Sequence, residues 1–332
     1  MNVMKRFATL LCLVLCLAGC KSGKALLPNV SGKAGEILVV MEKADWEGTL
    51  GGEVRGLLAC ECPYLAQREA LYTLVNVIPS GFADLFKVHR NIVLVNISSA
   101  SDQAAKVSFL RDVWASPQCV VQIAAPSSEE AVSALIANAK GITAFIEQAE
   151  RDRVIANCKL YETKEIAAQV NDVFGGSPHF PSGYKLKKKT ADFAWIADEK
   201  QYTIQGILIY KYPVDGDDLT LDKIITHRNA ILKDNVPGMF DNTYMTTSSG
   251  FPLDLEYLKY RKRDFAQVRG YWEVENDYMG GPFVSHSFYS PDGGSVIVAE
   301  AFVYAPRYDK RQYLRQVESI LYSWDWAEEE KE

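Results

Sequence analysis

Residues 283–304 read FVSHSFYSPDGGSVIVAEAFVY and predict two strands that pair antiparallel. The segments 283–289 and 295–304 are apolar runs of strand length, which is typical of buried strands. Between them stands Ser290-Pro291-Asp292-Gly293-Gly294, with proline at the second turn position and a glycine where a positive φ is needed. We therefore expect a hairpin with a bulged three-residue loop.

The loop length sets which side chains share a face of this hairpin. With three loop residues, Val284 lies opposite Glu300, and His286 projects from the same apolar face as Glu300. Burying a charge without a partner is costly, so both side chains should be paired or open to a pocket. His286 and Glu300 are therefore the candidate catalytic residues, as a general base or a ligand anchor, with Ser285 or Ser287 as nucleophile. The simpler interpretation is a hydrogen-bonded structural pair.

The second half of the chain predicts further strands around this hairpin and two amphipathic helices. The expected strands are 184–189, 193–197, 202–212, 243–247 and 255–274, and the expected helices are 219–235 and 313–324. Antiparallel strands with flanking helices are typical of the α+β class. Residues 176–327 are therefore predicted to form a C-terminal α+β domain with a largely antiparallel sheet.

The first half predicts a second unit that also mixes strands and helices. The expected elements are strands at 36–41, 70–78, 91–97 and 119–124 and a helical stretch at 127–174 that breaks near residue 157. Ser127 and Glu130 fit a capping box at the start of that stretch. Gly175-Gly176 is the predicted boundary, which makes 36–175 an N-terminal α+β domain. A charged tail occupies 328–332.

The start of the chain is typical of an export signal. Two basic residues precede an apolar run, 7–17, that is shorter than the ~20 residues of a membrane-spanning helix. The run closes on Leu17-Ala18-Gly19-Cys20, which resembles the lipobox of bacterial lipoproteins. The resemblance implies removal of the signal peptide, 1–19, and attachment of acyl chains to Cys20. Such chains would anchor the protein to a membrane.

The residues around Cys20 bear on location and charge. Residue 21 is lysine rather than aspartate and no acidic run follows, so we expect outer-membrane attachment facing the periplasm. Residues 20–35 are rich in glycine and small polar side chains and are expected to form a lipidated tether. Loss of Lys5 and Arg6 with the signal changes the formal net charge from −6 to −8. This balance argues against nucleic-acid binding, which normally leaves a basic excess.

Four cysteines remain beyond the lipobox: Cys60, Cys62, Cys119 and Cys158. The single residue between Cys60 and Cys62 fits neither a zinc site nor a thioredoxin-like site. A neighbouring disulfide at that spacing would be strained. The possibilities that remain are a bridge such as Cys119–Cys158 or four buried thiols, and the sequence does not choose among the three full connectivities. The sequence predicts no metal and no cofactor.

Basic side chains recur along one face of the expected strand 255–274. They are Lys259, Arg261, Arg263 and Arg269, and Lys187 and Lys189 stand on another expected strand. Together they could form a basic surface for anionic lipid headgroups or glycan. A solvated sheet face with lysines that protect its edge is the simpler interpretation.

Two further features, together with the lipobox, carry a resemblance to a known family. Asp45-Trp46-Glu47-Gly48 follows the first expected strand, and His89-Arg90-Asn91-Ile92 leads into another. With the lipobox, they resemble a family of Bacteroidetes lipoproteins whose domain has no assigned function. The second half is also loosely similar in element order to the Mog1/PsbP-like fold, whose members are mostly binding and assembly factors. That likeness concerns the fold alone. His227-Arg228-Asn229 repeats the first three residues of the second motif in a different context, which favours coincidence.

These observations predict an envelope lipoprotein that acts as a non-enzymatic binding or assembly module. Its expected partners are the membrane, through the acyl chains on Cys20, and an envelope protein, a lipid headgroup or a glycan. One alternative is a hydrolase or transferase that uses His286 and Glu300. The other is a structural spacer without a ligand.

Overall fold

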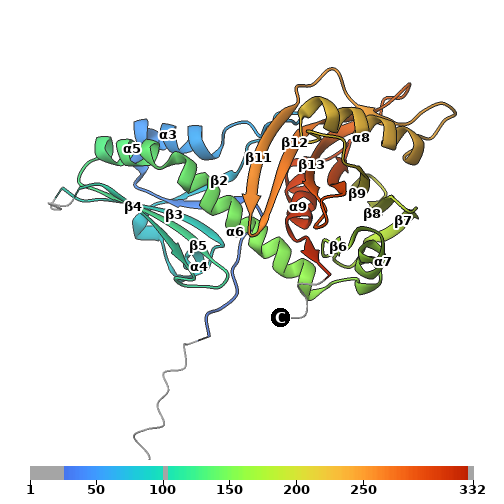
Figure 1. Ribbon diagram of the computed structural model, residues 1–332. Coiled ribbons are helices and arrows are strands. Elements are labelled where there is room, and N and C mark those ends of the chain that lie inside the picture. Colours follow the sequence, from blue (N-terminus) through green and yellow to red (C-terminus); the bar gives the residue numbers. More distant parts are fainter. Residues whose placement is uncertain (1–25, 100–103, 328–332) are drawn as a thin grey trace, which may run out of the picture.

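The computed structural model describes residues 26–99 and 104–327, and a long helix joins the two larger sheets of this part of the chain (Figure 1). The predicted signal peptide, Cys20 and the charged tail at 328–332 lie outside the described residues. The first sheet and its helices lie on the left of Figure 1, and the second sheet lies on the right. Both parts combine helices and strands, so the predicted α+β class is confirmed.

The first sheet is mostly parallel. Its strand order is β2-β1-β3-β5-β4, and β4 runs antiparallel to β5. The strands are β1 (Glu36–Val40), β2 (Thr73–Val77), β3 (Asn91–Ile97), β4 (Lys106–Arg111) and β5 (Cys119–Ala125). The sequence analysis missed β4, an edge strand with few buried side chains.

Helices cover both faces of the first sheet, which explains why its central strands are continuous apolar runs. Side chains of α3, α5 and α6 form the core on one face, and α4 packs on the other. The helices of this part are α2 (Lys43–Glu47), α3 (Thr49–Leu58), the 3₁₀ turn η1 (Pro79–Gly81), α4 (Asp84–Lys87), α5 (Ser128–Ala137) and α6 (Ala139–Leu160).

The long helical stretch that the sequence predicts at 127–174 divides into α5, α6 and α7 (Lys164–Phe174). Its start agrees with the predicted capping box, because the Ser127 hydroxyl accepts a hydrogen bond from the Glu130 amide at 3.2 Å. The breaks fall at Asn138 and at 161–163 rather than near residue 157. α7 ends at Gly175, whose φ of 70° suits glycine at a helix end.

The second sheet is antiparallel and has the order β10-β12-β13-β14-β9-β8-β7, with β11 paired to β12. α8 packs on one face of this sheet, and α7, α9 and the end of α6 pack on the other. Its elements are β7 (Lys185–Lys189), β8 (Phe193–Lys200), β9 (Thr203–Pro213), α8 (Leu221–Asn235), β10 (Met245–Thr247), β11 (Asp254–Tyr260), β12 (Arg263–Val274), β13 (Gly280–Tyr289), β14 (Ser295–Tyr304) and α9 (Arg311–Tyr322). A small ribbon pairs β6 (Gly176–Ser177) with β15 (Asp325–Trp326).

The β13–β14 hairpin forms as predicted, but its register differs by one residue. Ser285 pairs with Glu300, and His286 pairs with Ala299. The loop has four residues rather than three, because the Ser290 amide donates to the Ser295 carbonyl at 2.9 Å. A shift of one residue moves side chains to the opposite face of a strand. His286 therefore faces α9, whereas Glu300 faces α8.

The predicted strand 255–274 is in fact the hairpin of β11 and β12. Tyr260 pairs with Arg263 across a two-residue turn, Arg261-Lys262. Arg261 has a φ of 53°, a conformation that glycine or asparagine normally supplies in such turns. The sequence carries neither residue there, so the turn signal was missing.

Two further features place the parts of the chain relative to one another. The first half of α6 packs on the first sheet through Ile142 and Ile146, and its second half packs on the core of the second sheet through Ile155.

Residues 28–35 are held against the first sheet, where the Ser31 amide donates to the Val88 carbonyl at 2.8 Å, so this part of the predicted tether is not free. Among the described helices, none is both long and apolar enough to cross a membrane.

Candidate functional site

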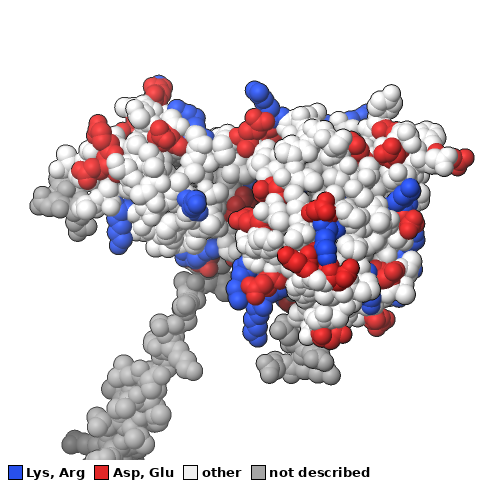
Figure 2. All heavy atoms as spheres, turned by 45° about the horizontal axis from the view of Figure 1, so that its top comes forward, with Lys and Arg blue, Asp and Glu red and all other residues white. Residues whose placement is uncertain are grey.

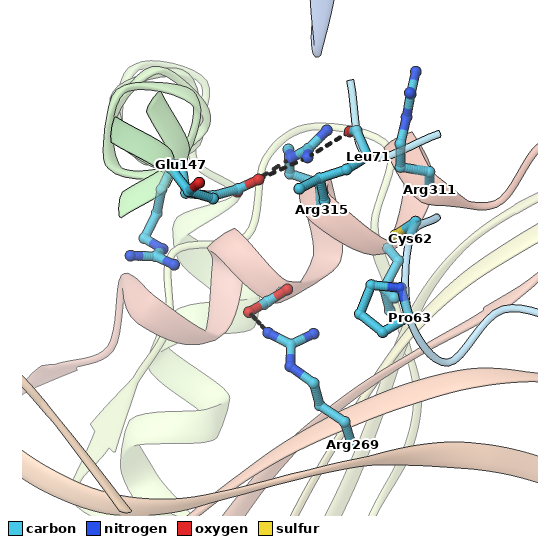
Figure 3. Close-up of a pocket in the computed structure, with 11 residues that line it drawn as sticks. Cys62, Pro63, Leu71, Glu147, Arg269, Arg311 and Arg315 are labelled. Carbon is cyan, nitrogen blue, oxygen red and sulfur yellow. Dashed lines mark hydrogen bonds and ion pairs between the residues drawn. The ribbon is translucent and has the colours of Figure 1, made fainter. Parts of the chain in front are cut away.

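A hollow of about 250 Å³ lies where α6, α9, β12 and the loop before β2 meet (Figure 3). Four arginines line it, and we call it the arginine pocket: Arg151, Arg269, Arg311 and Arg315. Two glutamates, Glu147 and Glu318, are the acidic residues of the described lining. The pocket therefore has a surplus of positive charge in a chain that is acidic as a whole.

Helix periodicity brings these side chains to the pocket. On α9, Arg311, Arg315 and Glu318 stand at steps of four and three residues and share one face. On α6, Glu147 and Arg151 stand four residues apart. The opposite face of α9 packs into the core, which fixes the direction of its charged face.

The first ion pair of the pocket joins α6 to α9. The Arg315 guanidinium donates to the Glu147 carboxylate at 2.7 and 3.3 Å, and Tyr72 also donates to Glu147. Burial alone would raise the pKa of Glu147, but Arg315 and Tyr72 outweigh it and lower the pKa. Glu147 is therefore ionised at neutral pH, and Arg315 is its ion-pair partner.

The second ion pair joins α9 to β12. Arg269 donates to Glu318 and, through Nε, to the Gln267 side chain at 3.0 Å. Burial would lower the pKa of Arg269, but Glu318 outweighs burial and raises it.

The other two arginines have no carboxylate within ion-pair distance among the described residues. Arg311 donates to the carbonyl of Ala70 and, at 3.3 Å, to the Thr73 hydroxyl. Arg151 donates to Gln148 at 3.1 Å and stacks on the ring of Tyr322 at 3.7 Å. Burial and the neighbouring charge of Arg315 lower the pKa of Arg311. Guanidinium groups bind carboxylates and phosphates in this kind of setting.

Cys62 is a potential nucleophile on the wall of the pocket. Burial raises the pKa of its thiol to about 11. The thiol is therefore protonated at neutral pH, and a protonated thiol is a poor nucleophile. At neutral pH Cys62 therefore presents an uncharged thiol to the pocket.

The structure separates His286 from Glu300, so the predicted catalytic pair is wrong. Glu300 accepts two hydrogen bonds from Arg228, at 2.7 and 2.8 Å, and both side chains are fully buried under α8. Arg228 also stacks over Phe283 at 4.0 Å. Glu300 thus belongs to a closed ion pair rather than to a site that substrate could enter.

His286 lies on the other side of the sheet and is also fully buried. It packs on the rings of Phe265 and Tyr322, with centroids 4.2 and 4.6 Å away. Burial and the nearby charges of Arg263 and Arg269 hold its pKa well below the usual value. His286 is therefore neutral and enclosed.

The predicted basic surface does not form, because its members lie apart. Lys187 and Lys189 stand on β7, at the opposite edge of the sheet from the β11–β12 hairpin. Lys187 pairs with Glu199 at 2.6 Å, and Lys259 pairs with Asp264 at 3.4 Å. On the face drawn in Figure 2, basic side chains are interspersed with acidic ones.

Arg263 and Arg269, the other members of that predicted surface, point under α9. Arg269 lines the arginine pocket, and Arg263 donates to the Leu321 carbonyl at 3.0 Å. Both side chains lie on the face of β12 that α9 covers, because they alternate with the side chains packed under α8. Arg261 occupies the turn beside them.

Of the two possibilities for the cysteines, the Cys119–Cys158 disulfide is absent: within the described residues all four cysteines are free thiols, and Cys119 and Cys158 are buried. Cys119 lies in the core of the first sheet, and Cys158 lies in the core of the second. Burial raises the pKa of each thiol to about 12. They are packing residues of two separate cores.

The arginine pocket itself was not predicted. Helical spacing indicated the charged face of α9, but nothing in the sequence pairs Arg315 with Glu147, which lies 168 positions earlier. The repeated His-Arg-Asn motif supplies an arginine to two buried ion pairs elsewhere in the fold. Arg90 and Arg228 each bind a buried glutamate, Glu150 at 3.1 Å and Glu300 at 2.7 Å.

Two family models without an assigned function match parts of the chain. Residues 30–159 match a family described as domain of unknown function (DUF8532), and residues 163–323 match one described as domain of unknown function (DUF4837). The two matched segments meet just after α6. No curated protein matches the chain.

Proposed function

We propose that the protein is a lipid-anchored envelope protein and a non-enzymatic binding or assembly module. Cys20 anchors it to the outer membrane, and the folded part faces the periplasm. The arginine pocket holds the anionic group of its ligand, a carboxylate or a phosphate. Sequence features support the location, and pocket geometry supports the binding role.

The charge surplus of the arginine pocket carries the binding proposal. Glu147 and Glu318 are each taken up by one arginine, so Arg151 and Arg311 are left with neutral acceptors. Taking a guanidinium out of water is unfavourable unless an anion compensates it. An incoming carboxylate or phosphate would supply that compensation with hydrogen bonds of good geometry.

The same lining favours binding over catalysis. Cys62 is held in its protonated form, and His286 and Glu300 lie outside the pocket on opposite faces of the sheet. The pocket also lies between the two parts of the chain, a position where ligands often bind. A ligand held there would contact α6 and α9 together.

The location rests on the lipobox Leu17-Ala18-Gly19-Cys20 and on the family resemblance to Bacteroidetes lipoproteins. We expect Cys20→Ala to release the protein from membranes, because one polypeptide tail without acyl chains binds a bilayer weakly. Cell fractionation with immunoblotting measures this. Membrane association equal to that of the unchanged chain would contradict the anchor.

Titration calorimetry of the purified full chain with succinate and with inorganic phosphate tests the arginine pocket. We expect one of these anions to bind and Arg311→Ala to weaken it about tenfold, the effect of losing ~1.4 kcal/mol of contact. Arg307→Ala is the matched control, because Arg307 is exposed and stacks on Tyr202 outside the pocket. Equal binding by the two variants, or no heat with either anion, would overturn the proposal.

A further inference from the structure

A second hollow, of about 430 Å³, lies where the end of β12, the turn before β13 and the segment between β14 and α9 meet. We call it the tyrosine pocket, because Tyr271, Tyr278 and Tyr304 line it. Its volume falls within the range of about 300–1,000 Å³ that is usual for small-molecule sites. It shares no lining residue with the arginine pocket, so separate variants can test the two sites.

The pairing of β12 with β13 shapes one wall of the tyrosine pocket. Tyr271 and Glu273 stand two residues apart on β12, so their side chains project from the same face of the sheet. Glu273 pairs with Gly280, the first residue of β13. The Tyr271 ring stacks on Phe251 with centroids 4.2 Å apart, and a Cβ atom at Gly280 would lie 2.9 Å from the Tyr271 ring. Glycine at this position therefore leaves room for that ring beside the hollow.

Lys310 brings a buried positive charge to the tyrosine pocket. Its exposed fraction is 5%, and its ammonium donates to the Gln67 side-chain oxygen at 2.8 Å and to the Tyr308 carbonyl at 3.4 Å. Both acceptors are neutral, and no ion pair of the described residues includes Lys310. An ammonium has three N–H donors, so one of them has no acceptor in this part of the chain. A further acceptor would offset the cost of burying this charge.

Two carboxylates line the same pocket without meeting a cation. Glu273 and Asp277 form no ion pair with any described residue. Asp277 accepts a hydrogen bond from the Tyr278 amide at 2.6 Å, which occupies one of its oxygens. Charges of both signs thus face the hollow, and Lys310 lies beyond ion-pair distance of either carboxylate. A ligand between them could contact both.

Two of the aromatic side chains are accessible to such a ligand. Tyr278 is fully exposed in the turn before β13, and Tyr304 is half-buried at the end of β14. Neither hydroxyl has a hydrogen-bond partner among the residues that the structure describes. A phenol ring offers an apolar face together with a hydroxyl that can both donate and accept.

The mixture of donors and acceptors narrows the class of ligand. A simple cation would pair with Glu273 and Asp277 but would be repelled by Lys310, and a simple anion would meet the opposite difficulty. A sugar is uncharged and carries hydroxyls, each of which both donates and accepts. Its hydroxyls can therefore contact both kinds of charged group at once, while the C–H groups of its ring pack against aromatic side chains.

We propose that the tyrosine pocket binds a carbohydrate. Glu273 and Asp277 accept hydrogen bonds from sugar hydroxyls, and Lys310 donates to another hydroxyl from the floor of the pocket. The rings of Tyr278 and Tyr304 pack against the sugar. This site goes beyond the proposed function, because it is separate from the arginine pocket and takes an uncharged ligand.

An oligosaccharide array followed by a titration tests the proposal. The purified full chain is applied to an array of maltose, cellulose and chitin oligosaccharides, and the one that binds most tightly is titrated by calorimetry. We expect Tyr278→Ala to weaken binding about tenfold, which corresponds to ~1.4 kcal/mol. Tyr161→Ala is the matched control, because Tyr161 is also exposed and lies outside the pocket, at the end of α6.

A second pair of variants tests the polar contacts. Glu273→Gln should also weaken binding of the same oligosaccharide, because a carboxylate accepts stronger hydrogen bonds than an amide does. Glu256→Gln, at an exposed position of β11 outside the pocket, should bind as the unchanged chain does. Circular dichroism of each variant checks that the fold is retained.

Three outcomes would overturn the proposal. No binding to any oligosaccharide of the array, or equal binding by Tyr278→Ala and Tyr161→Ala, removes the site. Binding of spermidine but of no oligosaccharide, lost in Glu273→Gln, reassigns the pocket to an organic cation. Oligosaccharide binding that responds to Arg311→Ala but not to Tyr278→Ala places the sugar in the arginine pocket, so that this inference fails while the proposed function stands.

Discussion

The Arg228–Glu300 pair and the arginine pocket use the same two residue types to opposite effect. Under α8, one arginine meets one glutamate through two hydrogen bonds, and both side chains are 0% exposed. Between α6 and α9, four arginines meet two glutamates around an open hollow. The first arrangement is complete and closed, and the second is open and has more guanidinium groups than carboxylates. The comparison teaches that the ratio and enclosure of the charges, rather than their presence, indicate a binding site.

The largest effect is expected at the closed pair. Glu300→Gln leaves the Arg228 charge buried without a counterion, and such a loss typically costs about 3–5 kcal/mol of unfolding free energy. Chemical denaturation followed by circular dichroism measures it. The double variant Arg228→Met with Glu300→Leu should recover most of that stability, because it removes both charges. A loss below ~1 kcal/mol for Glu300→Gln would show that the pair is not closed.

The open site should respond differently to the matching change. Glu147→Gln leaves Arg315, whose side chain is 10% exposed, without its carboxylate, and we expect a loss of about 2 kcal/mol, below that at the closed pair because Glu147 is 28% exposed. The same change increases the surplus of positive charge in the pocket. The affinity for succinate or phosphate should therefore rise several-fold, as titration calorimetry would measure. If the ion pair has only a structural role, the Glu147→Gln variant should lose stability without gaining affinity for either anion.

The two regions also differ in how far the sequence could predict them. The apolar runs and turn residues of 283–304 were sufficient for the hairpin, because strand formation depends on neighbouring residues. The face of Glu300 was wrong, because one additional loop residue reverses every side chain of a strand. The turn at Arg261 was not predicted, because the sequence has arginine at a position of positive φ, where glycine or asparagine is usual. The sequence therefore predicted the strands of the hairpin but not the register in which they pair.

The arginine pocket was beyond prediction for a different reason. The face of α9 that carries Arg311 and Arg315 follows from helix periodicity. Its partners come from α6, from β12 and from a loop near Cys62, which are distant in sequence. Only the packing of α6 across both sheets brings them together. A charged helix face in the sequence is equally consistent with a solvated surface.

The smallest effect is expected at a third charged cluster, which lies between the two extremes in enclosure. His179 is held between Glu162 at 2.6 Å and Asp325 at 2.9 Å and ties the end of α6 to β15. Burial alone would lower the pKa of His179, but the hydrogen bonds to Asp325 and Glu162 outweigh burial and raise it. Lys159, the nearby cation, opposes this rise.

The raised pKa of His179 gives the stability a defined pH dependence. The protonated ring contributes fully below its unfolded pKa of about 6.5, and the contribution is lost as the pH rises through the higher folded value. Unfolding free energy should therefore fall between pH 6 and pH 9, by about 1 kcal/mol or less, since the partners are partly exposed. His179→Gln should remove this slope, whereas His227→Gln, on a histidine stacked against Tyr212, should keep it. If urea denaturation gives both variants the same dependence of unfolding free energy on pH, His179 is neutral in the folded protein. The cluster would then be held by hydrogen bonds alone, unlike the charged Arg228–Glu300 pair.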